Sequence, residues 1–265
     1  QEGCGGMYNG KTFNRETVYI CGNYMDGAIY PVFQKPGVRR GRCKPTSEIQ
    51  AVLNQRSAEK KITRLVHNNF TGEDLALHLT YRRSMEPESE EEAQRYLSNF
   101  QRRLKRRYKK LGLELKYISC TEYGLRGGRC HHHLIISGGC DRDAIEKLWG
   151  KGYANSKRLQ FEADGVKGLT HYIAKDKHFY KRWNQSRNLA IPEPVQQDGK
   201  LNMENVAEIR EVIESKNPHR FFEEKYPDFI LIEASCVWNQ VNRGVYIQFE
   251  MRRRKNGLCK VNMKS

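Results

Sequence analysis

The chain has 265 residues, with 47 Lys and Arg against 31 Asp and Glu and a formal net charge of +16. This length allows one domain with a substantial core, or one domain with a small additional unit. The charge favours association with polyanions such as nucleic acids, although an ordinary basic protein is the alternative. No apolar run reaches the roughly 20 residues of a membrane span, and no signal peptide is recognisable, so we expect a cytoplasmic protein without membrane contact.

Eight cysteines are scattered through the chain, and none forms a CxxC pair. Small secreted proteins use cysteines as a dense disulfide framework, and this pattern differs from theirs. The spacing also gives no support to a four-cysteine zinc site. We therefore expect reduced thiols in a cytosol.

The first predicted elements are two strands, over residues 17–25 and 28–33, which are rich in Val, Ile, Tyr and Phe. They flank Asp26-Gly27, a dipeptide typical of tight hairpin turns. The sequence therefore predicts a β-hairpin that turns at this dipeptide.

A basic connector over residues 35–44 precedes an amphipathic helix that begins near residue 47. Residues 74–82 then alternate between apolar and polar, with Leu77 on one face and His78 on the other. Such alternation predicts a half-buried strand.

A long helix is predicted next, because Ser89 and Glu92 resemble a capping box and apolar residues recur at helical spacing up to Leu111. The opposite face is strongly basic, and a solvated surface is one interpretation of it. The other interpretation is contact with a nucleic-acid backbone, for which the candidates are Arg102, Arg103, Arg106 and Lys109.

Residues 113–122 and 130–137 predict an antiparallel hairpin across a Gly-rich linker, and Arg129 in this linker is a further candidate DNA contact. A short helix should begin at Asp141 or Asp143. A strand over 153–161 and a helix over 166–183 complete this part of the chain. Prolines interrupt the chain at 192 and 194, and a helix over 203–215 and a hairpin formed by 229–237 and 245–251 are then predicted.

The order of these elements predicts an α+β fold of the split β-α-β type. We expect a central antiparallel sheet with helices on one face, while the other face stays open for a substrate. The expected division is an N-terminal hairpin and connector at 1–45, a main domain at 46–190, and a C-terminal helix and hairpin at 191–265.

A metal site is predicted on the strand that contains His131 and His133. Alternate residues of a strand share a face, so these two imidazoles lie about 6.5–7 Å apart and can bind one divalent ion. Glu122 ends the neighbouring strand and is the predicted third ligand. Two imidazoles and a carboxylate suit Mn²⁺ or Mg²⁺ with open positions for phosphate oxygens.

Tyr172 is the candidate nucleophile, with Lys175 one turn further along the same helix. A nearby cation favours the phenolate, and attack on a phosphodiester would give a 5′-phosphotyrosyl intermediate and a free 3′ hydroxyl. An ordinary half-buried aromatic is the alternative for Tyr172. Tyr153 and Tyr180 are rival tyrosines, while Tyr123 and Trp183 could stack on single-stranded bases or pack in the core.

Three stretches in this order resemble the motifs of the HUH endonucleases, most closely the rolling-circle replication initiator (Rep) proteins of plasmids and phages. They are Leu77-His78-Leu79-Thr80-Tyr81, similar to the FLTLT strand; Cys130-His131-His132-His133-Leu134-Ile135-Ile136, similar to the HUH motif; and Tyr172-Ile173-Ala174-Lys175, similar to YxxK. The resemblance covers roughly residues 46–190. The middle HUH position is usually a bulky hydrophobe and here is His132.

The resemblance implies a nick in single-stranded DNA at a replication origin, inside a bacterial host cell, with the 3′ hydroxyl priming a host polymerase. The chain contains no GxxxxGK[ST] motif, so strand separation is expected from a host helicase. Three alternatives remain open. They are a single-tyrosine HUH transposase, a non-catalytic nucleic-acid-binding module, and a phosphodiesterase that uses water in place of tyrosine.

Overall fold

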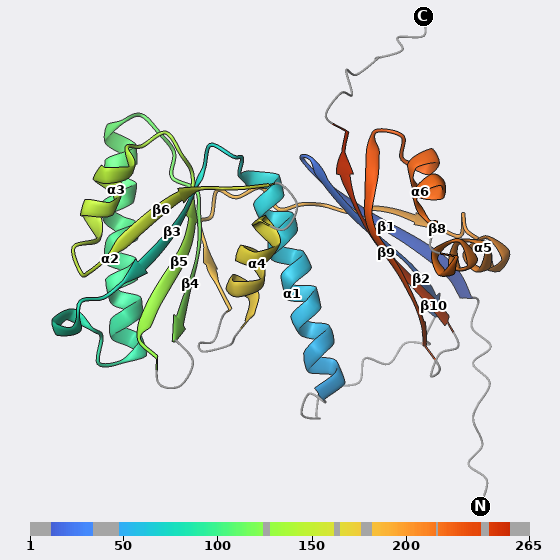
Figure 1. Ribbon diagram of the computed structural model, residues 1–265, viewed down its shortest axis with the longest axis horizontal. Coiled ribbons are helices and arrows are strands. Elements are labelled where there is room, and N and C mark those ends of the chain that lie inside the picture. The colour runs from blue at the N-terminus through green and yellow to red at the C-terminus, as the bar shows by residue number, and fades with distance from the viewer. Residues whose placement is uncertain are drawn as a thin grey trace, which may run out of the picture. The chain divides into compact units, whose positions relative to one another are not determined.

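The computed structural model describes residues 12–33, 48–123, 128–161, 165–175, 182–215, 217–239 and 244–254. Within these ranges the chain forms two antiparallel five-stranded sheets with flanking helices, which confirms the predicted α+β class. The sheets belong to two compact units, one within residues 46–191 and the other built from 1–45 and 192–265 (Figure 1).

The unit within residues 46–191 contains the sheet with strand order β6-β3-β5-β4-β7, in which every pairing is antiparallel. Its elements, in chain order, are α1 (Glu48–Asn69), β3 (Leu75–Thr80), α2 (Glu90–Lys110), β4 (Tyr117–Tyr123), β5 (Cys130–Ile136), α3 (Arg142–Trp149), β6 (Ala154–Arg158), α4 (Gly165–Lys175) and β7 (Asn184–Gln185).

Helices cover both faces of this sheet, whereas the sequence predicted helices on one face only. Leu77 and Leu134 lie on the face that packs against α2 and α3. Ile118 and Ile135 lie on the other face, where α1 and α4 add a second apolar core (Figure 1). The second face therefore leaves only part of its surface for a substrate. The predicted alternation of apolar and polar residues along the strands was correct. It could not show that α1, which precedes β3, and α4, which follows β6, both pack on the second face.

The helix α2 begins as predicted, because the Ser89 hydroxyl accepts a hydrogen bond from the backbone N–H of Glu92 at 3.2 Å. The Glu92 carboxylate accepts from the N–H of Glu88 at 3.0 Å, so the reciprocal half of the predicted capping box is displaced by one residue. The apolar stripe is buried, and each large side chain in it contributes roughly 1.5–3 kcal/mol. Its members are Ala93, Leu97, Phe100, Leu104 and Tyr108.

Of the two helices predicted after β5, the first agrees with the prediction and the second differs from it. The short helix α3 begins after Asp141, whose carboxylate accepts from the N–H of Ala144 at 2.9 Å. The helix predicted over 166–183 is α4, and Arg182 and Trp183 lie outside it. Trp183 packs against the core beneath α1 and α4 and donates to Gln185 Oε1 at 3.0 Å, so its indole is used in packing.

The second unit has the strand order β8-β1-β2-β10-β9, and α5 and α6 pack on this sheet through a shared apolar core. The first and last of the three expected segments thus contribute to one sheet, in which β2 pairs with β10. Its elements are β1 (Thr12–Cys21), β2 (Tyr24–Phe33), β8 (Val195–Asp198), α5 (Met203–Glu214), α6 (His219–Lys225), β9 (Phe229–Asn239) and β10 (Gly244–Arg253). The strand β8 and the helix α6 were not predicted.

The N-terminal hairpin turns at Gly22-Asn23, and the prediction of a turn at Asp26-Gly27 was wrong. Gly22 has a φ of 58°, which glycine adopts at no steric cost. Gly27 lies inside β2, where a Cβ would come within 2.2 Å of the Phe249 ring. The glycine is therefore needed for packing against β10. The basic connector at 35–44 lies entirely within 34–47, outside the described residues.

None of the described helices is both long and apolar enough to cross a membrane. The cysteines that the structure describes are free thiols, namely Cys21, Cys120, Cys130, Cys140 and Cys236.

Candidate metal centre and its tyrosine

The strand β5 places two histidines between two neighbouring strands. In the register of the sheet His133 lies opposite His78 of β3, and His131 lies opposite Glu122 of β4. Because side chains alternate along a strand, these four residues share one face, the face that also packs against α1 and α4.

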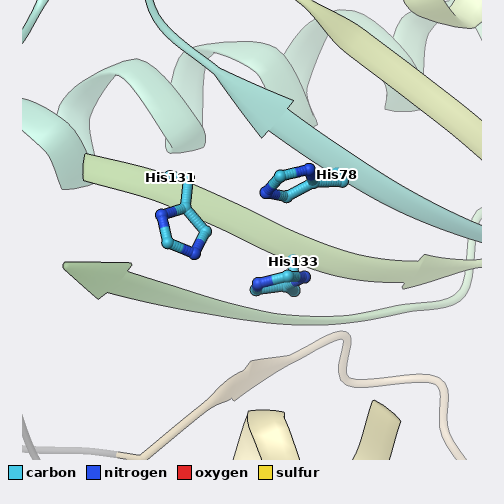
Figure 2. Close-up of side chains that lie close together, drawn as sticks. All are labelled: His78, His131 and His133. Atoms are coloured by element: carbon cyan, nitrogen blue, oxygen red, sulfur yellow. The ribbon is translucent and has the colours of Figure 1, made fainter. Parts of the chain in front are cut away.

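Three imidazoles converge on this face, those of His78, His131 and His133 (Figure 2). One ring nitrogen of each lies within 4.8 Å of the others. The ring centroids of His78 and His133 are 4.8 Å apart, and each is 5.1 Å from that of His131. These three residues could hold a metal ion.

His78 was not among the ligands predicted from the sequence. The alternation of residues 74–82 put it on the polar face of its strand, but that pattern does not reveal which strand lies beside it. The pairing of β3 with β5 supplies the missing information, since it brings His78 next to His133.

Glu122 lies where the sequence placed it, beside both predicted histidines. Its Oε2 atom is 3.2 Å from Nε2 of His131 and 3.2 Å from Nε2 of His133. A carboxylate in this position can bind the ion directly, or it can hold the two rings in a fixed orientation.

The electrostatics of the cluster favour neutral imidazoles. Burial, and then the neighbouring imidazoles, lower the pKa of His133 to about 4. The pKa of His78 is also lowered, mainly by burial and then by His131. Neutral imidazole is the form that binds a metal ion, so the cluster does not require proton loss from these two rings at neutral pH.

His132, between the two cluster residues, points to the other face and is fully buried there. Its Nε2 is 2.6 Å from the Tyr81 hydroxyl and its Nδ1 is 2.8 Å from Thr121 Oγ1. Burial lowers the pKa of His132 to about 3, so the ring is neutral. This histidine is a hydrogen-bonded core residue that lies away from the cluster.

The predicted nucleophile lies against the cluster. The ring of Tyr172 stacks on that of His133, with 6.1 Å between centroids and 22° between planes, and Tyr172 is 52% exposed. Two hydrogen bonds join α4 to α1 just before Tyr172, from Thr63 to Thr170 at 3.0 Å and between His171 and Glu59 at 2.9 Å. Lys175 is the last residue of α4, and its side chain is outside the described part of the structure.

The basic residues of α2 are not brought together with the cluster, because α2 packs on the opposite face of the sheet. Arg103 donates to the carbonyls of Leu148 at 3.0 Å and Trp149 at 3.2 Å, at the end of α3. Arg102 bonds to Asn99, while Arg106 and Lys109 are exposed.

Two further residues proposed for DNA contact make contacts within the protein. Arg129 pairs with Glu86 at 3.1 Å and also donates to the carbonyl of Tyr81. Tyr123, a candidate for base stacking, packs against the core beneath α2.

The site thus consists of three histidines that could hold a metal ion and a tyrosine ring stacked on one of them, all in an antiparallel α+β unit. Residues 74–177 match the model of a family described as replication-associated protein. No curated protein and no solved structure gave a match. The matched segment contains the whole cluster and Tyr172, and the match supports a rolling-circle replication initiator, in agreement with the HUH motifs.

Proposed function

We propose that the chain is a metal-dependent, site-specific DNA nickase and strand-joining enzyme that initiates rolling-circle replication through a 5′-phosphotyrosine on Tyr172. The observation that carries this proposal is the stacking of Tyr172 on His133, beside His78 and His131. The match to replication-associated proteins supports DNA as the substrate.

We assign metal binding to His78, His131 and His133, with Glu122 as a fourth ligand or as the group that orients the two β5 histidines. The proximity of the three ring nitrogens and the lowered pKa values of His78 and His133 support this assignment. A bound divalent ion would polarise the phosphate and offset its negative charge. A site rich in imidazole suits Mn²⁺ better than Mg²⁺, which prefers oxygen ligands.

In the proposed reaction the Tyr172 hydroxyl loses its proton to solvent and its oxygen attacks the phosphorus of the scissile phosphodiester. The new bond joins this oxygen to phosphorus, and the bond from phosphorus to the 3′ oxygen breaks. The 3′ oxygen takes up a proton and leaves as a free hydroxyl, which a host polymerase could extend. The phosphodiester energy is kept, so attack by a 3′ hydroxyl on the phosphotyrosine rejoins a strand.

Lys175 would act one helical turn from the nucleophile, by favouring the phenolate or by giving a proton to the leaving oxygen. The α2 residues would act elsewhere. Arg102, Arg106 and Lys109 would contact DNA that flanks the nick on the other side of the sheet, whereas the hydrogen bonds of Arg103 to α3 favour a structural role.

The test is a denaturing gel of end-labelled single-stranded oligonucleotides that tile the replication origin of the encoding element, incubated with protein and Mn²⁺. The proposal predicts a cleaved strand with a free 3′ hydroxyl and a protein-linked 5′ fragment. Both should be absent with Tyr172→Phe and present with Tyr30→Phe, which alters a tyrosine of β2 in the other unit. Cleavage without a protein-linked fragment would point to water as the nucleophile, and binding without cleavage would point to a non-catalytic module.

A further inference from the structure

Three exposed side chains on the edge strand β6 and immediately before it lie on the same face as the histidine cluster. Asn155 lies opposite His78 in the register of β3 and β6, and Lys157 lies opposite Ala76. Tyr153, just before β6, continues this alternation next to Thr80. Tyr153 is 83% exposed, more than any other large apolar side chain in the described part of the chain.

The backbone at Tyr153 is fixed although its ring is exposed. The N–H of Thr80 donates to the Tyr153 carbonyl at 2.8 Å, and the N–H of Arg82 donates to the carbonyl of Lys151 at 2.9 Å. Gly152 lies so close to β3 that a Cβ would come within 2.3 Å of the Thr80 carbonyl oxygen. Ala154 packs into the core on the α2 side, so the Tyr153 ring is held on the cluster side.

The exposure of this ring has no explanation in packing. An aromatic ring normally stabilises a fold by burial, and this one is left in water at the edge of the sheet. Asn155 and Lys157 are exposed as well, and the structure shows neither side chain with a hydrogen bond or ion pair to any described residue. The three side chains are about 6.5–7 Å apart along the strand, and β6 lies two strands, roughly 10 Å, from β5.

We propose that Tyr153, Asn155 and Lys157 form a binding site for the single-stranded DNA substrate, one or two nucleotides from the scissile phosphate. Tyr153 stacks on one base, Asn155 hydrogen-bonds a base edge, and Lys157 pairs with a phosphate. An aromatic face, an amide and a cation in a row match the chemistry of an unpaired nucleotide strand, and the net charge of +16 agrees with a polyanion. The location next to the scissile bond rests on the proposed function.

The test measures binding apart from cleavage, by fluorescence anisotropy in EDTA with all variants made in a Tyr172→Phe background. A labelled oligonucleotide carrying the nick site is compared with a series in which one nucleotide at a time is abasic. Tyr153→Ala should weaken binding of the intact strand on the order of five- to hundred-fold, while Tyr153→Phe, which keeps the ring, stays within about two-fold. At one position of the oligonucleotide, removal of the base should lower the DNA affinity of the Tyr172→Phe protein. The same removal should not lower further the affinity of the variant that also carries Tyr153→Ala.

The lysine has its own readout. Lys157→Gln should reduce the slope of log affinity against log salt by about 0.7, the value for one phosphate contact on a single strand. An unchanged Mn²⁺ affinity in each variant serves as the control for folding.

Two outcomes would overturn the inference. One is an unchanged affinity and unchanged abasic penalty in Tyr153→Ala, and the other is tighter binding of duplex DNA or of RNA of the same sequence. The chemistry is judged separately. If the wild type nicks DNA and Tyr153→Ala binds it normally, only the proposed binding site is contradicted. If the abasic effect depends on Tyr153 but no nicking occurs, only the proposed reaction is contradicted.

Discussion

The ring of Tyr172 lies parallel, within 22°, to the ring of His133, at a centroid distance of 6.1 Å. The first residue belongs to a helix and the second to the central strand β5, and the contact exists because α4 packs on the cluster face of the sheet. The proposed nucleophile therefore lies beside one of the three histidines that could hold a metal ion.

Removal of His78 should weaken metal binding. His78→Ala is expected to lower Mn²⁺ affinity at least ten-fold, because one of three imidazole ligands is lost, and His133→Ala should abolish binding. Isothermal titration calorimetry measures both, and His171→Ala, which alters an exposed histidine paired with Glu59, is the control. Normal Mn²⁺ affinity in His78→Ala would return the ligand set to Glu122, His131 and His133.

His132 should stabilise the fold without binding the ion. His132→Leu leaves the Tyr81 hydroxyl without its 2.6 Å partner in a buried site, at a cost of about 1–3 kcal/mol in unfolding free energy. Urea denaturation measures this cost. The double variant Tyr81→Phe/His132→Leu removes both polar groups and should recover part of the loss, and Mn²⁺ affinity should be unchanged in both variants.

The same histidine should make the metal-free protein sensitive to acid. The pKa of His132 is about 3 in the folded state against about 6.5 in an unfolded chain, so the unfolded state binds more protons between these values. Stability therefore falls as the pH drops below about 6.5. Between pH 7.5 and 5.5, in chelator, His132→Gln should lose about 1.4 kcal/mol less than the wild type. Equal losses in both proteins would mean that His132 is not held neutral.

Two neighbouring arginines of α2 should behave differently. Arg103→Ala removes two hydrogen bonds to the end of α3 and should cost about 1.5–3 kcal/mol of stability. Arg106→Ala should change stability by less than about 0.5 kcal/mol but weaken DNA binding and its salt dependence. Thermal unfolding and anisotropy titrations separate the two effects. A DNA defect in Arg103→Ala at a temperature where it is fully folded would give that residue a role in binding.

Local patterns in the sequence predicted the elements that depend on local physics. The apolar spacing after Ser89 predicted α2, and the alternation in residues 130–137 placed His131 and His133 together and His132 apart. Both predictions depend on the periodicity of a helix or a strand and on residues that are close together in the sequence.

The errors concern partners that are far away in the sequence. Gly27 was read as a turn residue because it follows Asp26. The real reason for the glycine is its contact with Phe249, which belongs to the last described strand and is far away in the sequence. His78 was left out because strand order, not strand character, brings it beside His133. The packing of α1 and α4 on the second face of the sheet was missed for the same reason. The apolar stripe of a helix does not show which sheet, or which face of it, the helix packs against.

A covalent bond between DNA and Tyr172 can be detected by mass spectrometry of the protein after reaction with a nick-site oligonucleotide and Mn²⁺. We expect an intact-mass increase equal to the 5′-phosphorylated fragment, and proteolysis should locate it on the peptide that contains Tyr172. Cleaved DNA with unmodified protein, or an adduct on the peptide that contains Tyr153, would contradict it.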